Sequence, residues 1–233
     1  VLRSVARDKD IIFQNLAHTG KTPAYIRYSV PLWLYEDLRK VYGREETERM
    51  LDWFLHGEKT NYVRFQDGHT EVRSGDIVHS DAFRNGELTI QDYASQQVGI
   101  EAAPEKGDYV VDVCAAPGGK SCHIAALLEG TGQVDARDLS EGKVALIRQN
   151  IERQKLTNIS AKALDARTLD PTLLDPEGQG IADIVVADLP CSGLGILGKK
   201  PDIRFRASRE NIAALQKLQR EILDTVCQYV KPG

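Results

Sequence analysis

A cysteine stands directly behind a proline in the segment DLPCSGLG, residues 188–195, just after the apolar run 184–187. A thiol in such a place can bind a metal, pack in the core or attack a substrate. The four cysteines (Cys114, Cys122, Cys191 and Cys227) are widely spread and form no CxxC pair. Their spacing disfavours both a zinc site and a disulfide framework, and it favours a reducing, cytoplasmic setting. From its position alone, Cys191 is a candidate nucleophile.

Three aspartates follow three successive strand-like runs: Asp138, Asp165 and Asp188. Each could be a simple cap of a helix or turn, but three in register favour a ligand at the carboxyl ends of parallel strands. The preceding strand-like run leads into DVCAAPGGK, residues 112–120, which is neither GxGxxG nor a P-loop. Its Pro-Gly-Gly turn lets a ligand approach the backbone and leaves N–H groups free at the start of the next helix. A nucleoside with a carboxylate and no phosphates, such as S-adenosylmethionine, meets these requirements.

The second half of the chain alternates between strand and helix patterns. Strand-like runs cover residues 109–113, 132–139, 158–164 and 182–190, and helical patterns follow them, the last from about Asn211. The second run is a poorer strand, because Asp135 and Arg137 would lie inside the sheet. The alternation predicts an α/β, Rossmann-like fold with a mainly parallel sheet. In the first sixty residues, 28–43 and 44–57 have helical patterns, and the second is expected to stop at Gly57. Residues 61–87 show no pattern that defines a compact domain.

Composition narrows the function classes. The 233 residues suffice for one or two domains, and the net charge of −4 disfavours an indiscriminate nucleic-acid binder. Between residues 196 and 220, however, basic residues clearly outnumber acidic ones, which suits either a phosphate-contacting edge or a solvated surface. Neither a membrane-spanning run nor a signal-peptide core is apparent. The scattered histidines suggest no metal site.

Several segments resemble one known family. They are IQDYASQQ, DVCAAPGGK, ARDLS, ALDAR and VVADLPCSGLGILGKKPDIRFR, in that order. Together they resemble the bacterial ribosomal RNA cytosine-5 methyltransferases of the Sun/RsmB type, which act on small-subunit (16S) rRNA. The resemblance implies a class I methyltransferase domain over residues 88–233. It also implies a small, shortened α+β RNA-binding subdomain at 30–87, after the tail of a helical, NusB-like RNA-binding domain or linker at 1–29.

The resemblance also implies roles for individual residues. The binding site for S-adenosylmethionine would be lined by three aspartates and by the turn after the first strand. The aspartates are Asp138, Asp165 and Asp188, and the turn consists of Cys114, Ala115, Ala116, Pro117, Gly118, Gly119 and Lys120. Cys191 and Pro190 would lie beside the target base, and Asp188 would also contact the cytosine amino group. In the family, the attacking cysteine belongs to a later Thr-Cys segment, which we expect beyond Gly233. Cys191 would then assist breakdown of the covalent adduct, with attack as the minority interpretation.

The remaining expectations concern the other cysteines and the RNA. At Cys114 the backbone matters more than the thiol, whereas Cys122 and Cys227 are expected to pack against apolar neighbours. Phosphate contacts are expected from Lys199, Lys200, Arg204 and Arg206, and Phe205 is either a stacking surface for a base or a core residue. We expect a monomer that binds ribosomal RNA. Three alternatives stay open: another type of methyltransferase, another RNA target, and an RNA adaptor that binds the cofactor without catalysis.

Overall fold

The alternating second half of the chain forms a four-stranded parallel sheet in the computed structural model, which describes residues 2–18, 22–58 and 60–232. The strand order is β6-β5-β4-β7, and every neighbouring pair is parallel. These strands are β4 (Tyr109–Asp112), β5 (Gln133–Asp138), β6 (Ile159–Ala163) and β7 (Ile184–Val186). The predicted Rossmann-like α/β fold is confirmed. Strand order reverses between β4 and β7, and in such sheets ligands bind beyond the carboxyl ends of the strands at that point.

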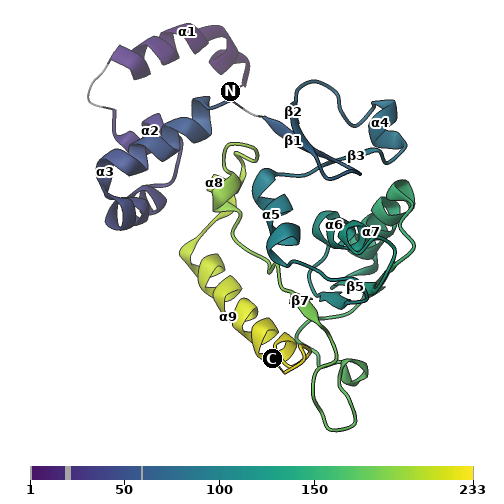
Figure 1. The fold of residues 1–233 in the computed structure, drawn as a ribbon. Helices are drawn as coiled ribbons and strands as arrows, with labels where there is room; N and C mark the ends of the chain where they lie inside the picture. The colour runs from purple at the N-terminus through teal and green to yellow at the C-terminus, as the bar shows by residue number, and fades with distance from the viewer. Residues whose placement is uncertain (1, 19–21, 59, 233) are drawn as a thin grey trace. The chain divides into compact units, whose positions relative to one another are not determined.

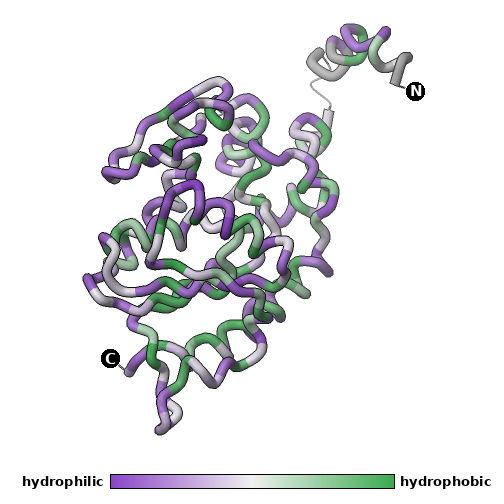
Figure 2. Tube along the Cα trace, turned by 90° about the vertical axis from the view of Figure 1, so that its right-hand side faces the viewer, coloured by the Kyte–Doolittle hydropathy of each residue, from purple (hydrophilic) through white to green (hydrophobic). Residues whose placement is uncertain are grey.

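Helices cover both faces of the parallel sheet (Figure 1). Val110 packs on one face with Ile124 and Ile147, from α6 (Gly119–Leu127) and α7 (Glu141–Gln154). Val111 packs on the other face with Ile222 of α9 (Arg209–Val226), and a short 3-10 helix, η1 (Pro171–Leu173), follows β6 on the way to β7. Because β4 is buried on both faces, its sequence is a continuous apolar run rather than an alternating one. In Figure 2 the segment leading to the C-terminus alternates between hydrophobic and hydrophilic residues, as a helix with one buried face requires.

A small antiparallel sheet precedes this fold, in a region where the residue pattern alone predicts no compact domain. It has the order β2-β1-β3, with β1 (Asn61–Phe65), β2 (Thr70–Arg73) and β3 (Leu88–Ile90). The helix α4 (Asp81–Arg84) begins at Ser80, whose hydroxyl accepts a hydrogen bond from Phe83 N, and α5 (Tyr93–Glu101) follows β3. Among the described residues of this region, the buried members of the apolar core are Val63, Leu88 and Ile77. With so few apolar positions, the region has little periodicity that sequence reasoning could detect.

The chain divides into two compact units, and the second is made of residues 60–191 and 212–233. The antiparallel sheet and the parallel sheet therefore share one unit, whereas the sequence placed a boundary at residue 87. The first unit combines residues 1–59 with the distant segment 192–211. It contains α1 (Leu2–His18), α2 (Ala24–Arg27), α3 (Leu32–His56), the 3-10 helix η2 (Leu194–Ile196) and α8 (Ile203–Arg206).

The core of the first unit explains why it is discontinuous. Leu34 and Leu51 of α3 are buried together with Leu197, which comes from the distant segment. The sequence predicted two helices before residue 57, and α3 is indeed interrupted at Gly43, where φ is +76°. The second of these stretches ends at Gly57, as predicted.

Candidate active site

The turn after β4 lies at the carboxyl end of the sheet and is held by backbone hydrogen bonds. Ala115 N donates to Arg137 O at 2.8 Å, which joins the turn to β5, and Cys122 N donates to Gly118 O at 2.9 Å, which starts α6. Gly118 has φ +102°, and a Cβ added there would lie 3.2 Å from the Ile147 side chain. Both the conformation and the close approach of α7 therefore require glycine at this position.

Asp138, at the end of β5, binds the turn through its carboxylate. Its Oδ2 accepts a hydrogen bond from Ala116 N at 3.0 Å, and its Oδ1 accepts one from Leu139 N at 2.7 Å. The Lys143 ammonium lies 2.9 Å from Oδ1, so this buried carboxylate has a nearby positive charge. Asp138 thus fixes the turn and the start of α7 in relation to β5.

A cavity of ≈ 360 Å³ opens beside these groups. All three sequence-predicted carboxylates line it: Asp138, Asp165 and Asp188. Apolar side chains complete its wall, among them Leu139 after β5 and two from α9, Leu218 and Ile222. An apolar slot with a few convergent polar groups is the usual form of a small-molecule site.

Asp165 stands in the loop after β6. Its carboxylate accepts hydrogen bonds from the Arg167 guanidinium, at 2.6 Å between Nη2 and Oδ2, and from Arg167 N at 3.0 Å. These bonds, led by that from the side chain, lower the pKa of Asp165 below its ordinary value. The carboxylate is therefore ionised at neutral pH and faces the cavity as a hydrogen-bond acceptor.

A second, smaller cavity of ≈ 190 Å³ adjoins the first, and both are lined by Cys114, Ala116 and Asp188. Lys120 lines the smaller one, and its Nζ lies 2.6 Å from Asp188 Oδ2. The Lys120 side chain is 19% exposed and that of Asp188 is 57% exposed. The pair thus places a cation and an accessible carboxylate between the two cavities.

Burial raises the pKa values of two groups near these cavities, and of the two only the Cys114 thiol is thereby kept neutral at neutral pH. Burial raises the pKa of the Cys114 thiol to about 11, with help from the charges of Asp138 and Asp112. Asp112 itself is 1% exposed, and burial raises its pKa to about 6 even though Ser121 Oγ donates a hydrogen bond to it at 2.6 Å. Cys114 is therefore a poor nucleophile, in keeping with a role for its backbone.

Cys191 is solvent-exposed and is not among the residues that line either of the two cavities. Pro190, which precedes it, lines the larger cavity, and its carbonyl accepts a hydrogen bond from Gln219 Nε2 of α9 at 2.8 Å. Cys122 is buried, as the sequence predicted. The prediction for Cys227 was wrong: it is exposed at the end of α9, outside the apolar stripe.

The basic segment that contains the four predicted phosphate contacts, residues 199–206, belongs to the first unit, and there the structure corrects the prediction for Arg204. This residue is only 4% exposed, and its Nη1 donates to the carbonyl oxygens of Tyr28 and Ser29, at 3.2 and 3.3 Å. It joins α8 to the N-terminal helices and is not available to RNA. Lys199, Lys200 and Arg206 are exposed, with Arg206 paired to Asp202 at 2.7 Å. Phe205 is 72% exposed, which rules out core packing.

Sequence reasoning missed part of the cavity wall. Leu218 and Ile222 gave no site signal, because a long-range contact brings α9 to the cavity, and Arg167, although it ends the segment ALDAR, was not singled out as a site residue. Gln91 and Asp92 belong to the recognised segment IQDYASQQ, and the structure places both at the smaller cavity. Among the described residues, no group of three or more His, Cys, Asp or Glu side chains could hold a metal ion. None of the described helices is long and apolar enough to cross a membrane.

Comparison with known proteins identifies a family and several relatives of the chain. The family model "16S rRNA methyltransferase RsmB/F" matches residues 100–233. Over its whole length the chain is 31% identical to the "Probable ribosomal RNA small subunit methyltransferase B" of Bacillus subtilis strain 168, of which it covers 57%. The chain therefore spans about half the length of the curated relatives it matches.

Two solved structures are also similar. The crystal structure of PH0851 aligns with 90% of the chain at a TM-score of 0.82 and 27% identity, and the aligned part is 52% of that chain. NSun6 from Pyrococcus horikoshii, solved with SFG, aligns with 71% of the chain at a TM-score of 0.61 and 29% identity, over 42% of its own length. With the family match over residues 100–233, these similarities confirm the resemblance seen in the sequence, and the chain belongs to the 16S rRNA methyltransferase RsmB/F family.

Proposed function

We propose that this chain binds S-adenosylmethionine and transfers its methyl group to carbon 5 of a cytosine in small-subunit ribosomal RNA. One observation carries the proposal: the turn after β4 and the carboxylates of Asp138, Asp165 and Asp188 meet at a single cavity of ≈ 360 Å³. The names of the relatives point to the same substrate class, and NSun6, one of the similar structures, was solved with SFG.

The chemistry of the lining suits S-adenosylmethionine. We assign Asp138, at the end of the second parallel strand, to the ribose hydroxyls, and Asp165 to the adenine amino group. Leu139, Leu218 and Ile222 supply apolar surface for the purine. Lys120 offers a cation to a carboxylate in the smaller cavity. When bound there, S-adenosylmethionine would supply an electrophilic methyl group.

Cytosine requires activation, because its carbon 5 is a poor nucleophile. Addition of a thiolate to carbon 6 makes carbon 5 enamine-like, so that it can take the methyl group. A base must then remove the carbon-5 proton, and the C6–S electron pair returns to sulfur as the thiol leaves. We assign Asp188 to the cytosine amino group, since it is half-exposed and held by Lys120 at 2.6 Å. Cys191, exposed three residues further on, would assist the release step rather than attack.

RNA would be held by the exposed basic segment of the first unit. Lys199, Lys200 and Arg206 are the proposed phosphate contacts, and the exposed ring of Phe205 is a proposed stacking surface for an unpaired base. A base must leave its stack to be methylated, so we expect the target cytosine in an accessible loop or in a flipped conformation.

Covalent trapping tests the reaction and the role of Cys191. The protein is incubated with S-adenosylmethionine and rRNA containing 5-fluorocytidine, which blocks removal of the carbon-5 proton, and adducts are resolved on a denaturing gel. Cys191→Ala is compared with Cys227→Ala, a matched change at the other exposed cysteine. An adduct that persists or accumulates in Cys191→Ala supports the assisting role.

Three results would contradict parts of the proposal. An adduct lost only in Cys191→Ala would make Cys191 the nucleophile and overturn its assignment. If natural rRNA gains no 5-methylcytosine while S-adenosylmethionine still binds, the catalytic proposal fails and a cofactor-binding adaptor is the better description. If the protein does not bind S-adenosylmethionine, the cofactor assignment fails as well.

A further inference from the structure

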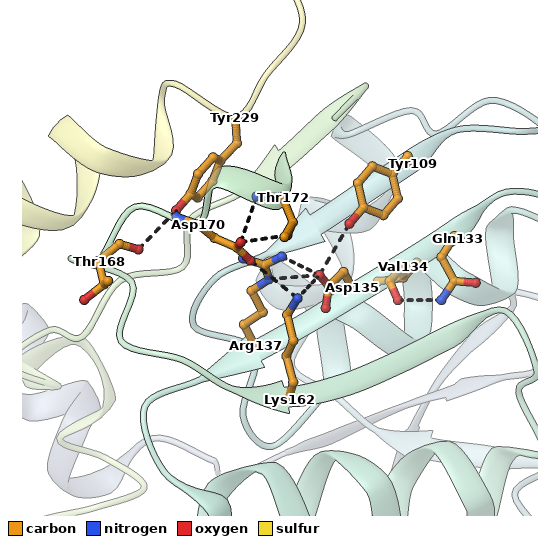
Figure 3. Close-up of polar contacts among 10 residues, drawn as sticks. All are labelled: Tyr109, Gln133, Val134, Asp135, Arg137, Lys162, Thr168, Asp170, Thr172 and Tyr229. Carbon is orange, nitrogen blue, oxygen red and sulfur yellow. Dashed lines mark hydrogen bonds and ion pairs between the residues drawn. The ribbon is translucent and has the colours of Figure 1, made fainter. Parts of the chain in front are cut away.

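A cluster of four charged side chains lies within the second unit, against the face of the sheet that α9 covers. Figure 3 shows Asp135 and Arg137 of β5, Lys162 of β6 and Asp170 from the loop after β6. Arg137 Nη2 lies 2.6 Å from Asp135 Oδ2, and Arg137 Nη1 lies 3.0 Å from Asp170 Oδ2 as an ion pair without the alignment of a hydrogen bond. Lys162 Nζ lies 3.2 Å from Asp135 and 3.5 Å from Asp170.

Burying such a cluster costs free energy, because its charged groups must leave water. The Arg137 side chain is 2% exposed and that of Asp135 is 7% exposed, so both have lost most of their water. Replacing buried ion pairs with well-packed apolar side chains is often neutral or stabilising. A directional arrangement of charges in this place therefore suggests that it fixes geometry rather than stability alone.

Arg137 connects three segments that line the larger cavity. Its carbonyl oxygen accepts the hydrogen bond from Ala115 N, at 2.8 Å, that holds the turn after β4. Its neighbour in the chain is Asp138, whose carboxylate binds the same turn. Its guanidinium reaches Asp170, which lies five residues after Asp165 in the loop that follows β6.

The loop that carries Asp165 is fastened at both ends. Before it, Leu164 N donates to Asp138 O at 2.9 Å. After it, Asp170 N donates to the Tyr229 hydroxyl at 2.9 Å, and that hydroxyl donates to Thr168 O at 3.2 Å. Between these points the loop has only a few residues, so the position of the Asp170 carboxylate constrains the position of Asp165.

We propose that Arg137 and Asp170 are positioning residues: their ion pair sets the distance between the carboxylates of Asp138 and Asp165 across the cavity and thereby the affinity for the adenosyl cofactor. This inference rests on the proposed function, since it takes S-adenosylmethionine as the ligand of the cavity. Neither residue lines the cavity, so they act through Asp165 and Asp138.

The first test is the affinity for S-adenosylhomocysteine, measured by titration calorimetry on protein whose folding has been checked by circular dichroism. Asp170→Asn keeps the one oxygen, Oδ1, that accepts both hydrogen bonds from Thr172, but it removes the charge that faces Arg137. We expect about tenfold weaker binding. Tyr109→Phe is the matched control, because it removes a contact of the same cluster, Tyr109 Oη to Asp135 at 3.4 Å, away from the loop. It should change affinity less than about twofold.

A double-mutant cycle separates positioning from a general loss of stability. In an Asp165→Ala background the contact that Asp170 is proposed to position is gone, so Asp170→Asn should then weaken binding by less than about twofold. If it still weakens binding about tenfold there, or if it lowers only the melting temperature in the wild-type background, the inference is wrong. Should Asp170→Asn not fold, Lys162→Met, at a side chain 46% exposed, removes the other cation that faces Asp170, and the same cycle applies. If the wild-type protein does not bind S-adenosylhomocysteine, the proposed function fails first.

Discussion

Replacing Asp112 by asparagine should remove a pH dependence of the free energy of unfolding. The carboxyl group of Asp112 is 1% exposed, and burial raises its pKa from 3.8 to about 6. The folded protein therefore holds this proton more tightly than the unfolded chain. The stabilisation from protonation is fully present below the unfolded pKa and is lost as the pH rises through about 6.

The size of the effect follows from the two pKa values. A difference between 3.8 and about 6, at about 1.36 kcal/mol per pKa unit, is worth about 3 kcal/mol over the whole range. About 2 kcal/mol of this falls between about pH 4.5 and about pH 7.5, where the rest of the protein is less disturbed by acid. Asparagine can still accept the hydrogen bond from Ser121 Oγ, but its amide adds two donors at a buried position. That cost does not depend on pH, so only the change with pH is diagnostic.

Urea denaturation of the wild type and of Asp112→Asn across this pH range provides the measurement. The stability of the wild type relative to the variant should fall by about 2 kcal/mol as the pH rises. Asp165→Asn is the control of opposite sign, because hydrogen bonds from Arg167 lower the pKa of Asp165, and its contribution to stability is lost as the pH falls. If the curves for the wild type and Asp112→Asn run parallel, water reaches Asp112 and the reasoning from burial is refuted.

Two further predictions concern the basic segment and the thiols. Arg204→Ala should lower the free energy of unfolding by about 2–4 kcal/mol, since it leaves two carbonyl oxygens without their donor, whereas exposed Lys200→Ala should change it by less than about 0.5 kcal/mol. Lys200→Ala should instead reduce the slope of log affinity for rRNA against log salt by about 1, and an unchanged slope would exclude it from the phosphate contacts. In iodoacetamide labelling of the native protein near pH 8, followed by mass spectrometry, Cys191 should react well before Cys114 and Cys122. Their pKa values are raised by burial to about 11 and about 12, and rapid labelling of either would contradict their burial.

Sequence patterns predicted the structure best for a strand that is buried on both faces and for polar residues that follow parallel strands. The run around Val110 and Val111 predicted β4 because a central parallel strand is apolar on both faces. The aspartates after the strands predicted the cavity because parallel strands bring their carboxyl ends to one edge.

Other features depend on partners far away in the chain. Asp135 and Arg137 made residues 132–139 a poorer strand in the sequence, yet β5 forms there, because Lys162 and Asp170 supply opposite charges on the same face. Arg204 lies in a basic run, and nothing local reveals that carbonyl groups some 175 residues away bury it. The spacing of residues shows periodicity and local charge. The formation of β5 and the burial of Arg204 depend instead on tertiary contacts.

The discontinuous first unit has a consequence for synthesis on the ribosome. Leu34 and Leu51 emerge early, but Leu197, which shares their core, follows only about 150 residues after Leu51. At about 5–20 residues per second, the N-terminal helices would spend roughly 7–30 s without that partner. During this interval their apolar faces are open to chaperones or to wrong contacts. Residues 192–211 complete the first unit and residues 212–233 complete the second, so the cores of both units close only late in synthesis.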